Sequence, residues 1–397
     1  MNKIFIELLQ VALGTREKLS RVPTACEWEG IYEEAENQAI VGILLNGLEH
    51  LQAEMLPPLD IKLQWIGDVQ MIEHDNRSMS AACREIVEQF EKDGFKCCVL
   101  KGQANLRYYP EEMRLRRSPG DIDVWVVPAN DNDNENDNGY RHPVRRTLEY
   151  VEREHELTGL CWLHCNFDHS EEVPVEVHFR PSFMNEPIHN RRLQRWFRLQ
   201  QDAIFNDNVN QNDNVIQGMP VEVDVVYQMN HIYRHLIDEG VGLRQVVDYY
   251  YCLKAYRLQL KRFHTDITEN TDISFEHESS RISHIIEHLG MKRFAGALMY
   301  VMREVCGMSD EELLCEPNEK EGRFLLNEIM TAGNFGQSDP RMGELNTSSL
   351  LKRQLSQALR RIKRNMRFVT SYPGEVIWEP VARMEHFAWK KMGLWRI

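Results

Sequence analysis

The pattern of hydrophobic and polar residues divides the chain into a helical beginning, a β-rich middle and a helical end. Apolar residues at three- and four-residue spacings predict one helix over 26–48 and a second over 59–92, which ends at the turn signal Asp93–Gly94. Helical periodicity returns towards the C-terminus in three runs, over 225–260, 278–305 and 345–369. Most of the chain is therefore expected to be helical.

The middle of the chain predicts a small sheet, because short runs rich in β-forming residues replace the helical periodicity. Strand candidates lie at 95–100, 121–127, 160–167 and 173–179, with one helix near 143–154. We therefore expect an α+β protein with three parts: an N-terminal helical region over 1–94, a core with a small mixed sheet over 95–224, and a C-terminal helical domain over 225–397.

Composition excludes several classes of partner. The 397 residues carry a formal net charge of −14, which argues against indiscriminate binding to nucleic acid or anionic lipid. The basic run over 352–367 is interpreted as a solvated helix face with salt bridges. No stretch approaches the ~20 apolar residues that span a bilayer. The nine scattered cysteines lack a C-x-x-C pair, so we expect a reduced, cytoplasmic protein without a membrane partner.

Three acidic residues in the β-rich middle are able to converge on one cation. Asp121 and Asp123 are one residue apart, and in a strand such residues project from the same face, with Cα atoms ~6.6 Å apart. Glu176 joins that face if its strand is a neighbour. Three adjacent carboxylates repel one another unless a cation lies between them, and oxygen ligands near phosphate favour Mg²⁺. We therefore expect Asp121, Asp123 and Glu176 to be both metal ligands and catalytic residues, with Mg²⁺ as the cofactor.

A phosphate-binding turn is predicted just before these acids. The first strand candidate leads into Lys101–Gly102, and a short helix is expected from Gln103 to Tyr109. Glycine lets the backbone approach a ligand closely, and the free N–H groups of a helix start bind phosphate. Lys101 adds positive charge, and Arg117 precedes the acidic strand, where it can contact a triphosphate. We expect Lys101, Gly102, Gln103 and Arg117 to bind phosphate.

Two further acids compete for the role of third metal ligand. The segment VPVEV at 173–177 is echoed by MPVEVDV at 219–225, which makes Glu222 and Asp224 rivals of Glu176. We favour Glu176, because its strand follows the Asp-x-Asp strand through one helix and one hairpin. The rival segment runs directly into a helix.

Histidines near these segments are candidates for supporting roles. His178 lies two residues after Glu176 and shares its strand face. His231 and His235 are four residues apart on a predicted helix, a spacing that suits zinc, but the sequence HIYRH lacks the Glu of H-E-x-x-H. We therefore expect these histidines to contact the acceptor or to support the site.

Two other features are interpreted as structural. Cys161, His164 and Cys165 form one loose group. In a strand, Cys161, Leu163, Cys165 and Phe167 share one face, so we interpret the cysteines as part of a buried strand face rather than as ligands of a zinc site. The Asn/Asp-rich tracts at 131–139 and 206–214 cannot bury apolar surface, so we expect solvated loops.

The segments Val99–Val127 and Val173–Pro181 resemble the bacterial uncharacterised nucleotidyltransferase family of the polymerase-β-like superfamily. The resemblance rests on LKGQ, YYP, RRSPGDIDVWV and VEVHFRP. Helical residues around Trp28 and between His231 and Asp248 are similar to the family as well. The resemblance implies a polymerase-β-like core and Mg²⁺-dependent transfer of a nucleoside monophosphate from a nucleoside triphosphate.

The function expected from this resemblance leaves the acceptor unidentified. We expect ATP as the nucleotide and a hydroxyl on a small molecule or a protein as the acceptor. One departure keeps an alternative open, because Gln103 stands where the superfamily usually has Ser or Gly. Since glutamine cannot place a hydroxyl on the phosphate, the alternative is a catalytically silent regulatory protein that binds nucleotide.

Overall fold

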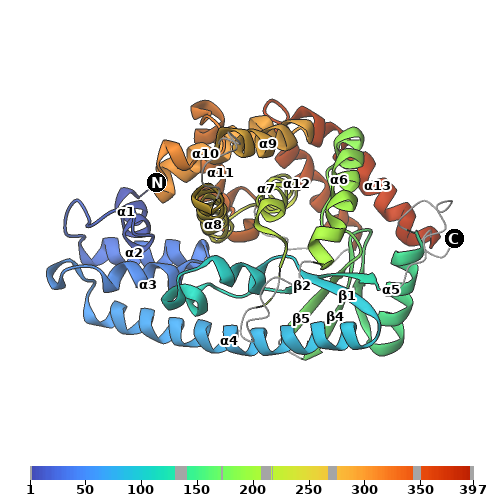
Figure 1. The fold of residues 1–397 in the computed structure, drawn as a ribbon. Coiled ribbons are helices and arrows are strands. Elements are labelled where there is room, and N and C mark those ends of the chain that lie inside the picture. The colour runs from blue at the N-terminus through green and yellow to red at the C-terminus, as the bar shows by residue number, and fades with distance from the viewer. Residues whose placement is uncertain are drawn as a thin grey trace.

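Helices surround a small sheet at one end of the molecule (Figure 1). The computed structural model describes residues 2–129, 141–170, 173–206, 216, 218–266, 275–342 and 350–393. All of the tract 131–139, and all but Asn206 of the tract 206–214, lie outside these residues. In the described part of the chain, no helix combines the length and the apolar character needed to cross a bilayer.

The described residues up to Lys92 form four α-helices, and the 34-residue helix expected over 59–92 is confirmed. That helix, α4, runs along the lower edge of the molecule in Figure 1, beneath both the other N-terminal helices and the sheet. The single helix expected over 26–48 is wrong: Ala39 has a left-handed φ of 55° and separates two helices. The four helices are α1 (Lys3–Ala12), α2 (Ala25–Asn37), α3 (Val41–Glu49) and α4 (Leu59–Lys92).

The β-rich middle forms one five-stranded mixed sheet with the order β1-β2-β5-β4-β3. Its central pair, β2 and β5, is parallel, and the other three pairs are antiparallel. The strand expected over 160–167 is confirmed only from His164 onward, because residues 161–163 turn the chain between two strands. The strands are β1 (Phe95–Val99), β2 (Ile122–Pro128), β3 (Leu157–Leu160), β4 (His164–Ser170) and β5 (Val173–His178), and α5 (Arg141–Glu154) connects β2 to β3.

The two faces of the sheet differ in what covers them. Ile122, Val124 and Val126 of β2 pack in an apolar cluster with residues of α4 and α5. Alternate residues point the other way, as the period of a strand requires. On that face Trp125 packs against Phe197 of α6 (Pro187–Asn206), with ring centroids 6.2 Å apart. This second face, towards α6 and the C-terminal helices, also carries Asp123.

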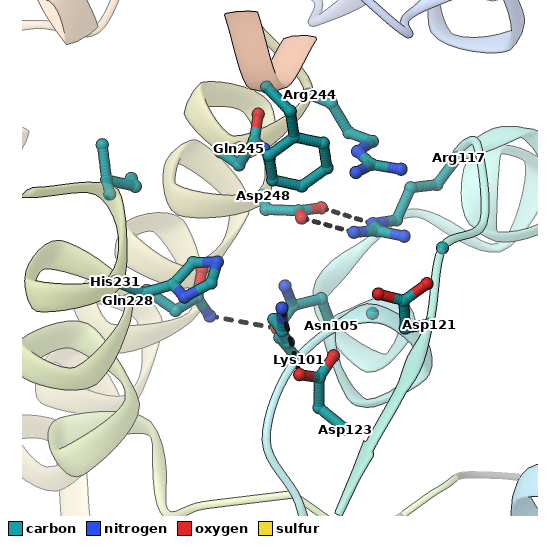
Figure 2. A pocket seen from close by; sticks show the side chains of 14 residues that line it. Lys101, Asn105, Arg117, Asp121, Asp123, Gln228, His231, Arg244, Gln245 and Asp248 are labelled. Carbon is teal, nitrogen blue, oxygen red and sulfur yellow. Dashed lines mark hydrogen bonds and ion pairs between the residues drawn. The ribbon is translucent and has the colours of Figure 1, made fainter. Parts of the chain in front are cut away.

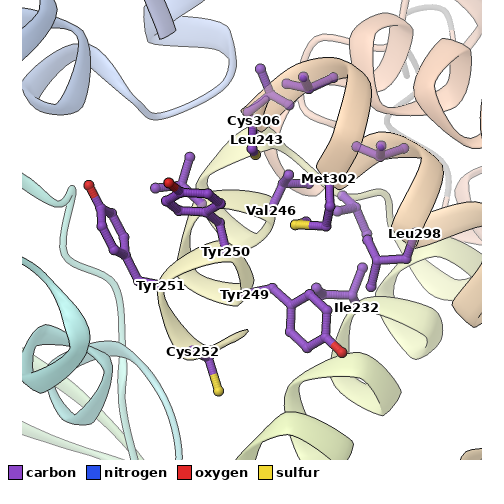
Figure 3. Close-up of a cluster of buried hydrophobic side chains, with 14 of the residues drawn as sticks. Ile232, Leu243, Val246, Tyr249, Tyr250, Tyr251, Cys252, Leu298, Met302 and Cys306 are labelled. Carbon is purple, nitrogen blue, oxygen red and sulfur yellow. The ribbon is translucent and has the colours of Figure 1, made fainter. Parts of the chain in front are cut away.

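The C-terminal part is helical, as expected, but two of the three predicted runs are each interrupted. Residues 239–242 separate α7 from α8, and residues 289–291 separate α9 from α10. Tyr249, Met302 and Leu298 pack at the centre of this part (Figure 3). The helices are α7 (Val221–Asp238), α8 (Leu243–Asp266), α9 (Phe275–His288), α10 (Lys292–Cys306), α11 (Glu319–Ala332), α12 (Leu350–Phe368) and α13 (Pro373–Met392).

Candidate active site

The Lys101–Gly102 turn forms as expected at the end of β1, but a 3₁₀ helix follows it. This helix, η2, spans Gly102–Tyr108. Gly102 has φ +62°, a conformation that L-residues with a side chain rarely adopt. A Cβ there would meet only the carbonyl oxygen of Asp121, at 3.5 Å, so the glycine is required by backbone conformation rather than by space.

Asp123, Glu176 and His178 form a compact polar cluster on the face of the sheet towards the C-terminal helices. The parallel register pairs Asp123 with Glu176 and Trp125 with His178. His178 Nε2 is 3.0 Å from Asp123 Oδ1 and 3.4 Å from Glu176 Oε2. One ligand atom from each of the three residues lies within 4.8 Å of the other two. These residues are therefore able to bind one metal ion together.

Asp121 lies beside this cluster rather than in it. It directly precedes β2, is exposed, and faces the same cavity as Asp123 (Figure 2). Although solvent reaches Asp121, the cavity wall partly desolvates its carboxylate, and this desolvation, followed by the charges of Asp123 and Glu176, raises its pKa. The expected repulsion between the three acids is therefore present, although His178, and not Asp121, completes the group of converging donor atoms.

The cluster balances its own negative charge with nearby cations. Lys101 Nζ is 3.0 Å from Asp123 Oδ1. Burial disfavours the charged form of His178, but its hydrogen bonds to Asp123 and Glu176 raise its pKa. Burial would raise the pKa of Glu176, but the hydrogen bond to His178 and the charges of His164 and Lys101 hold it well below its ordinary value. A bound cation would take over this balancing role.

The surroundings of His178 suit metal binding. Its Nδ1 is 3.2 Å from the carbonyl oxygen of Arg180, so a proton on Nδ1 is donated there. Nε2 donates to the two carboxylates, so both ring nitrogens carry a proton; a bound cation would replace the proton on Nε2, while Nδ1 would keep its own. Metal-binding histidines are commonly held in this way by a carbonyl or a carboxylate.

Two polar residues of β4 extend the cluster away from β2. His164 Nε2 is 3.6 Å from Glu176 Oε2, and its Nδ1 is 2.7 Å from Asn166 Oδ1. Asn166 Nδ2 donates to Glu176 Oε1 at 3.5 Å. No catalytic role was expected for His164, and none was predicted for Asn166. The sequence feature that could have indicated their role is the i, i+2 spacing, which places both residues on one face of a strand. That strand pairs with the strand of Glu176.

A cavity lies between the acidic residues and helices α7 and α8. Its enclosed volume is about 70 Å³, which is room for a phosphate group but not for a whole nucleotide. His231 lines it, and burial followed by the nearby His235 lowers the pKa of His231 well below its ordinary value. His235 does not line the cavity, and its Nδ1 is 3.2 Å from Glu239 Oε2.

Arg117 and Arg244 occupy different positions in the cavity wall. Arg117 makes a buried, two-pronged ion pair with Asp248, with N–O distances of 2.7 and 2.8 Å (Figure 2). Arg244 donates instead to the carbonyl oxygens of Ser118 and Pro119, and we find no carboxylate bound to it among the described residues. Burial and the charge of Arg117 lower the pKa of Arg244 to about 10, so it stays charged at neutral pH.

Gln103 and the rival acids are directed away from the cluster. Gln103 Nε2 donates to Ser80 Oγ at 2.8 Å, so its side chain faces α4. Asp224 lies in α7, where it accepts hydrogen bonds from Tyr108 and Arg107. Glu222 accepts one from Gln259, also outside the cluster.

Comparison with known proteins places the chain in a family. The family model described as "Uncharacterised nucleotidyltransferase" matches residues 24–270. Comparisons with curated proteins and with solved structures gave no match. The matched range contains the sheet, the polar cluster and every residue of the cavity wall except Phe335. It confirms the resemblance seen in the sequence, and the chain belongs to the family of uncharacterised nucleotidyltransferases.

Proposed function

We propose that this protein transfers a nucleoside monophosphate from a nucleoside triphosphate, with ATP as the expected donor, to the hydroxyl of an acceptor. The observation that carries the proposal is the convergence of Asp123, Glu176 and His178 beside the Lys101–Gly102 turn. The parallel pair β2–β5, with an antiparallel strand on either side, is consistent with a polymerase-β-like core.

The donor set fits a divalent cation. Two carboxylates and one imidazole would hold the ion, and when bound it would stabilise charge on the phosphate oxygens and on the leaving pyrophosphate. Mg²⁺ is the expected ion, but an imidazole donor also suits Mn²⁺, so both are to be tested. Lys101 is one-fifth exposed, which leaves its side chain room to turn from Asp123 to a phosphate when the cation arrives.

The remaining charged groups have separate tasks in this proposal. Arg244 and the backbone N–H groups after Gly102 bind the triphosphate. Arg117 acts indirectly, because its ion pair with Asp248 keeps the cavity wall in place. Asp121 faces the triphosphate from the start of β2, where its negative charge favours the metal-bound form of the nucleotide.

The chemical step exchanges one P–O bond for another. The acceptor oxygen forms a bond to the α-phosphorus, and the bond from that phosphorus to the pyrophosphate oxygen breaks, with its electron pair leaving on pyrophosphate. The acceptor proton passes to Glu176, which acts as the base, and a bound cation would assist by lowering the pKa of the acceptor hydroxyl.

Position-specific labelling tests the reaction. The protein is incubated with cell extract, Mg²⁺ or Mn²⁺, and ATP labelled at either the α- or the γ-phosphorus. We expect the α-label to enter a product and the γ-label to leave in pyrophosphate. Transfer of the γ-label would show a kinase and refute the proposal. ATP-dependent thermal stabilisation without pyrophosphate release would favour the silent regulatory protein instead.

A further inference from the structure

A second and larger cavity lies on the far side of His164 from the metal cluster. It encloses about 430 Å³ between the β3–β4 turn and the helices α7, α12 and α13. That volume falls in the range of pockets for small molecules. His164 forms part of its wall and contacts Glu176 on its other side. The larger cavity therefore begins next to the residue that would receive the acceptor proton.

The charges in this cavity favour an anion. Three arginines line it, Arg234, Arg361 and Arg383, against two carboxylates. Arg383 pairs with one of these, Asp238, at 3.3 Å, and also with Glu379 of α13, while the other cavity carboxylate, Glu239, accepts a hydrogen bond from His235 at 3.2 Å. The remaining two arginines have no carboxylate partner in the described ranges of the chain.

Arg234 is the better buried of these two arginines. Its Nε is buried and forms no hydrogen bond with a described residue, whereas one of its Nη atoms donates to His235 Nε2 at 3.0 Å. Its guanidinium lies 5.3 Å from the centroid of the Phe183 ring, which holds the side chain in place against the cavity wall. Arg361 is exposed on α12 at the mouth of the cavity. Together they offer planar donors of the kind that bind phosphate or carboxylate.

The aromatic wall does not offer a free face for stacking a nucleobase. Trp162 is stacked on His386, with centroids 4.8 Å apart and ring planes at 9°, and the Arg180 guanidinium lies 4.1 Å from the Trp162 centroid. Burial, followed by the charge of Arg180, lowers the pKa of His386 to about 4, so this ring is neutral at pH 7. The wall is a rigid apolar support, and the recognition groups are the arginines.

We propose that this cavity is the acceptor subsite, and that the acceptor is a small molecule with a phosphate or carboxylate group at one end and the reacting hydroxyl at the other. The anionic group binds Arg234 and Arg361, and the hydroxyl lies towards His164 and Glu176. This inference rests on the proposed transferase function. Helices α12 and α13 lie outside the residues that the family model matches, so the subsite combines residues from inside and outside the matched range.

A binding experiment tests the subsite without requiring turnover. Calorimetry is performed on the full chain with Mg²⁺ and a non-hydrolysable ATP analogue, so that the smaller cavity is filled. The probes are glycerol 3-phosphate, glycerate and uncharged glycerol. We expect the two anions to bind and glycerol not to. Arg361→Gln should weaken anion binding about tenfold, and Arg234→Gln at least as much.

Matched controls separate this site from the smaller cavity and from general charge effects. Lys363→Gln removes an exposed charge of α12 that does not line the cavity and should leave anion binding unchanged. Arg244→Gln should weaken binding of the ATP analogue but not of the anions. If glycerol bound as tightly as the anions, or if Arg361→Gln left anion binding unchanged, the proposed subsite would be refuted. This would hold even if the protein still released pyrophosphate.

The chemical class of the acceptor is tested by fractionation. An extract is divided into small anionic, small neutral, protein and RNA fractions, and each is incubated with α-labelled ATP. We expect the label to enter the small anionic fraction. The Arg361→Gln variant should incorporate less label than the Lys363→Gln variant. Label in protein or RNA would overturn the acceptor class. Intact binding of anions and nucleotide without label transfer to any fraction would refute the proposed function and, with it, the role of the cavity as an acceptor subsite.

Discussion

Two buried aspartates beside the smaller cavity, Asp123 and Asp248, have different kinds of surroundings. Both oxygens of Asp248 are occupied, by two guanidinium nitrogens of Arg117 and by the hydroxyl of Tyr109. The side-chain contacts shown for Asp123, from Lys101 and His178, all reach one oxygen, Oδ1. A carboxylate with both oxygens hydrogen-bonded within the protein stabilises the fold. A carboxylate with one oxygen not engaged by these contacts, beside a cavity, is able to bind a ligand.

Asp123→Asn tests the ligand-binding side of this comparison and has the largest expected effect. It should reduce metal-dependent nucleotidyl transfer by about 1,000-fold, or about 4 kcal/mol in activation free energy. The melting temperature should change little, because His178 can release its proton and Lys101 can turn to solvent. The control is Asp168→Asn, an exposed acid of β4. Unchanged transfer by Asp123→Asn would refute the metal site.

Asp248→Ala tests the structural side. Removing this carboxylate leaves the Arg117 guanidinium buried and unpaired, so the free energy of unfolding should fall by about 3–5 kcal/mol. Denaturant titration measures the change. The double variant Arg117→Met with Asp248→Leu should recover most of the loss, because an apolar pair replaces the ion pair. If the double variant did not recover stability, the Arg117–Asp248 ion pair would contribute more to stability than an apolar pair of similar size can replace.

A third buried carboxylate, Glu375, extends the comparison to an acid without a cationic partner among the described residues. It accepts backbone N–H bonds from Asn185 and Glu186, at 2.6 and 3.3 Å. Burial raises its pKa from 4.5 to about 7. Its contribution to stability is therefore fully present below pH 4.5 and is lost as the pH rises through 7.

The expected loss at Glu375 is about 1–3 kcal/mol between pH 4.5 and pH 8. Unfolding free energies measured across this range should decline more steeply for the wild type than for Glu375→Gln, which does not ionise. Parallel curves for the two proteins would show that Glu375 has the same pKa in the folded and unfolded states, contrary to the effect of its burial. The test separates an acid stabilised by cations from one that is held only by backbone donors.

The smallest expected effects compare the two residues of the phosphate turn. Gly102→Ala should lower the free energy of unfolding by about 1–2 kcal/mol, because residue 102 has a left-handed φ. It should also weaken the binding of ATP with Mg²⁺. Gln103→Ser should lower the free energy of unfolding by about 1 kcal/mol, because the hydrogen bond to Ser80 is lost. Nucleotide binding should be unchanged. Calorimetry and thermal melts separate these outcomes. If Gln103→Ser lost more nucleotide affinity than Gly102→Ala, the side chain of Gln103, and not the glycine turn, would be the phosphate-binding element.

Several features of the site were predictable because they depend on neighbours in the chain. The alternation of β2 placed Asp123 on the face opposite Ile122 and Val124, and the same period placed Glu176 and His178 together. The glycine at 102 marked the turn after β1, which the left-handed φ confirms. These are short-range properties, and one segment of sequence is enough to specify them.

Other features depend on residues far apart in the chain. Arg117 was expected to contact phosphate, but Asp248, 131 positions away, binds its guanidinium. His164 joins the cluster because the chain turns at 161–163, inside a segment that looked like one continuous strand.

The sequence by itself determined the alternating strands, the glycine turn and the acids available for a metal site, because strand periodicity and backbone conformation are local. Only the tertiary structure decided the register of Asp123 with Glu176, the replacement of Asp121 by His178 among the converging donors, and the second cavity under α12 and α13. Those outcomes depend on which strands and helices pack together, and packing is governed by the burial of side chains from distant segments, which no single segment encodes.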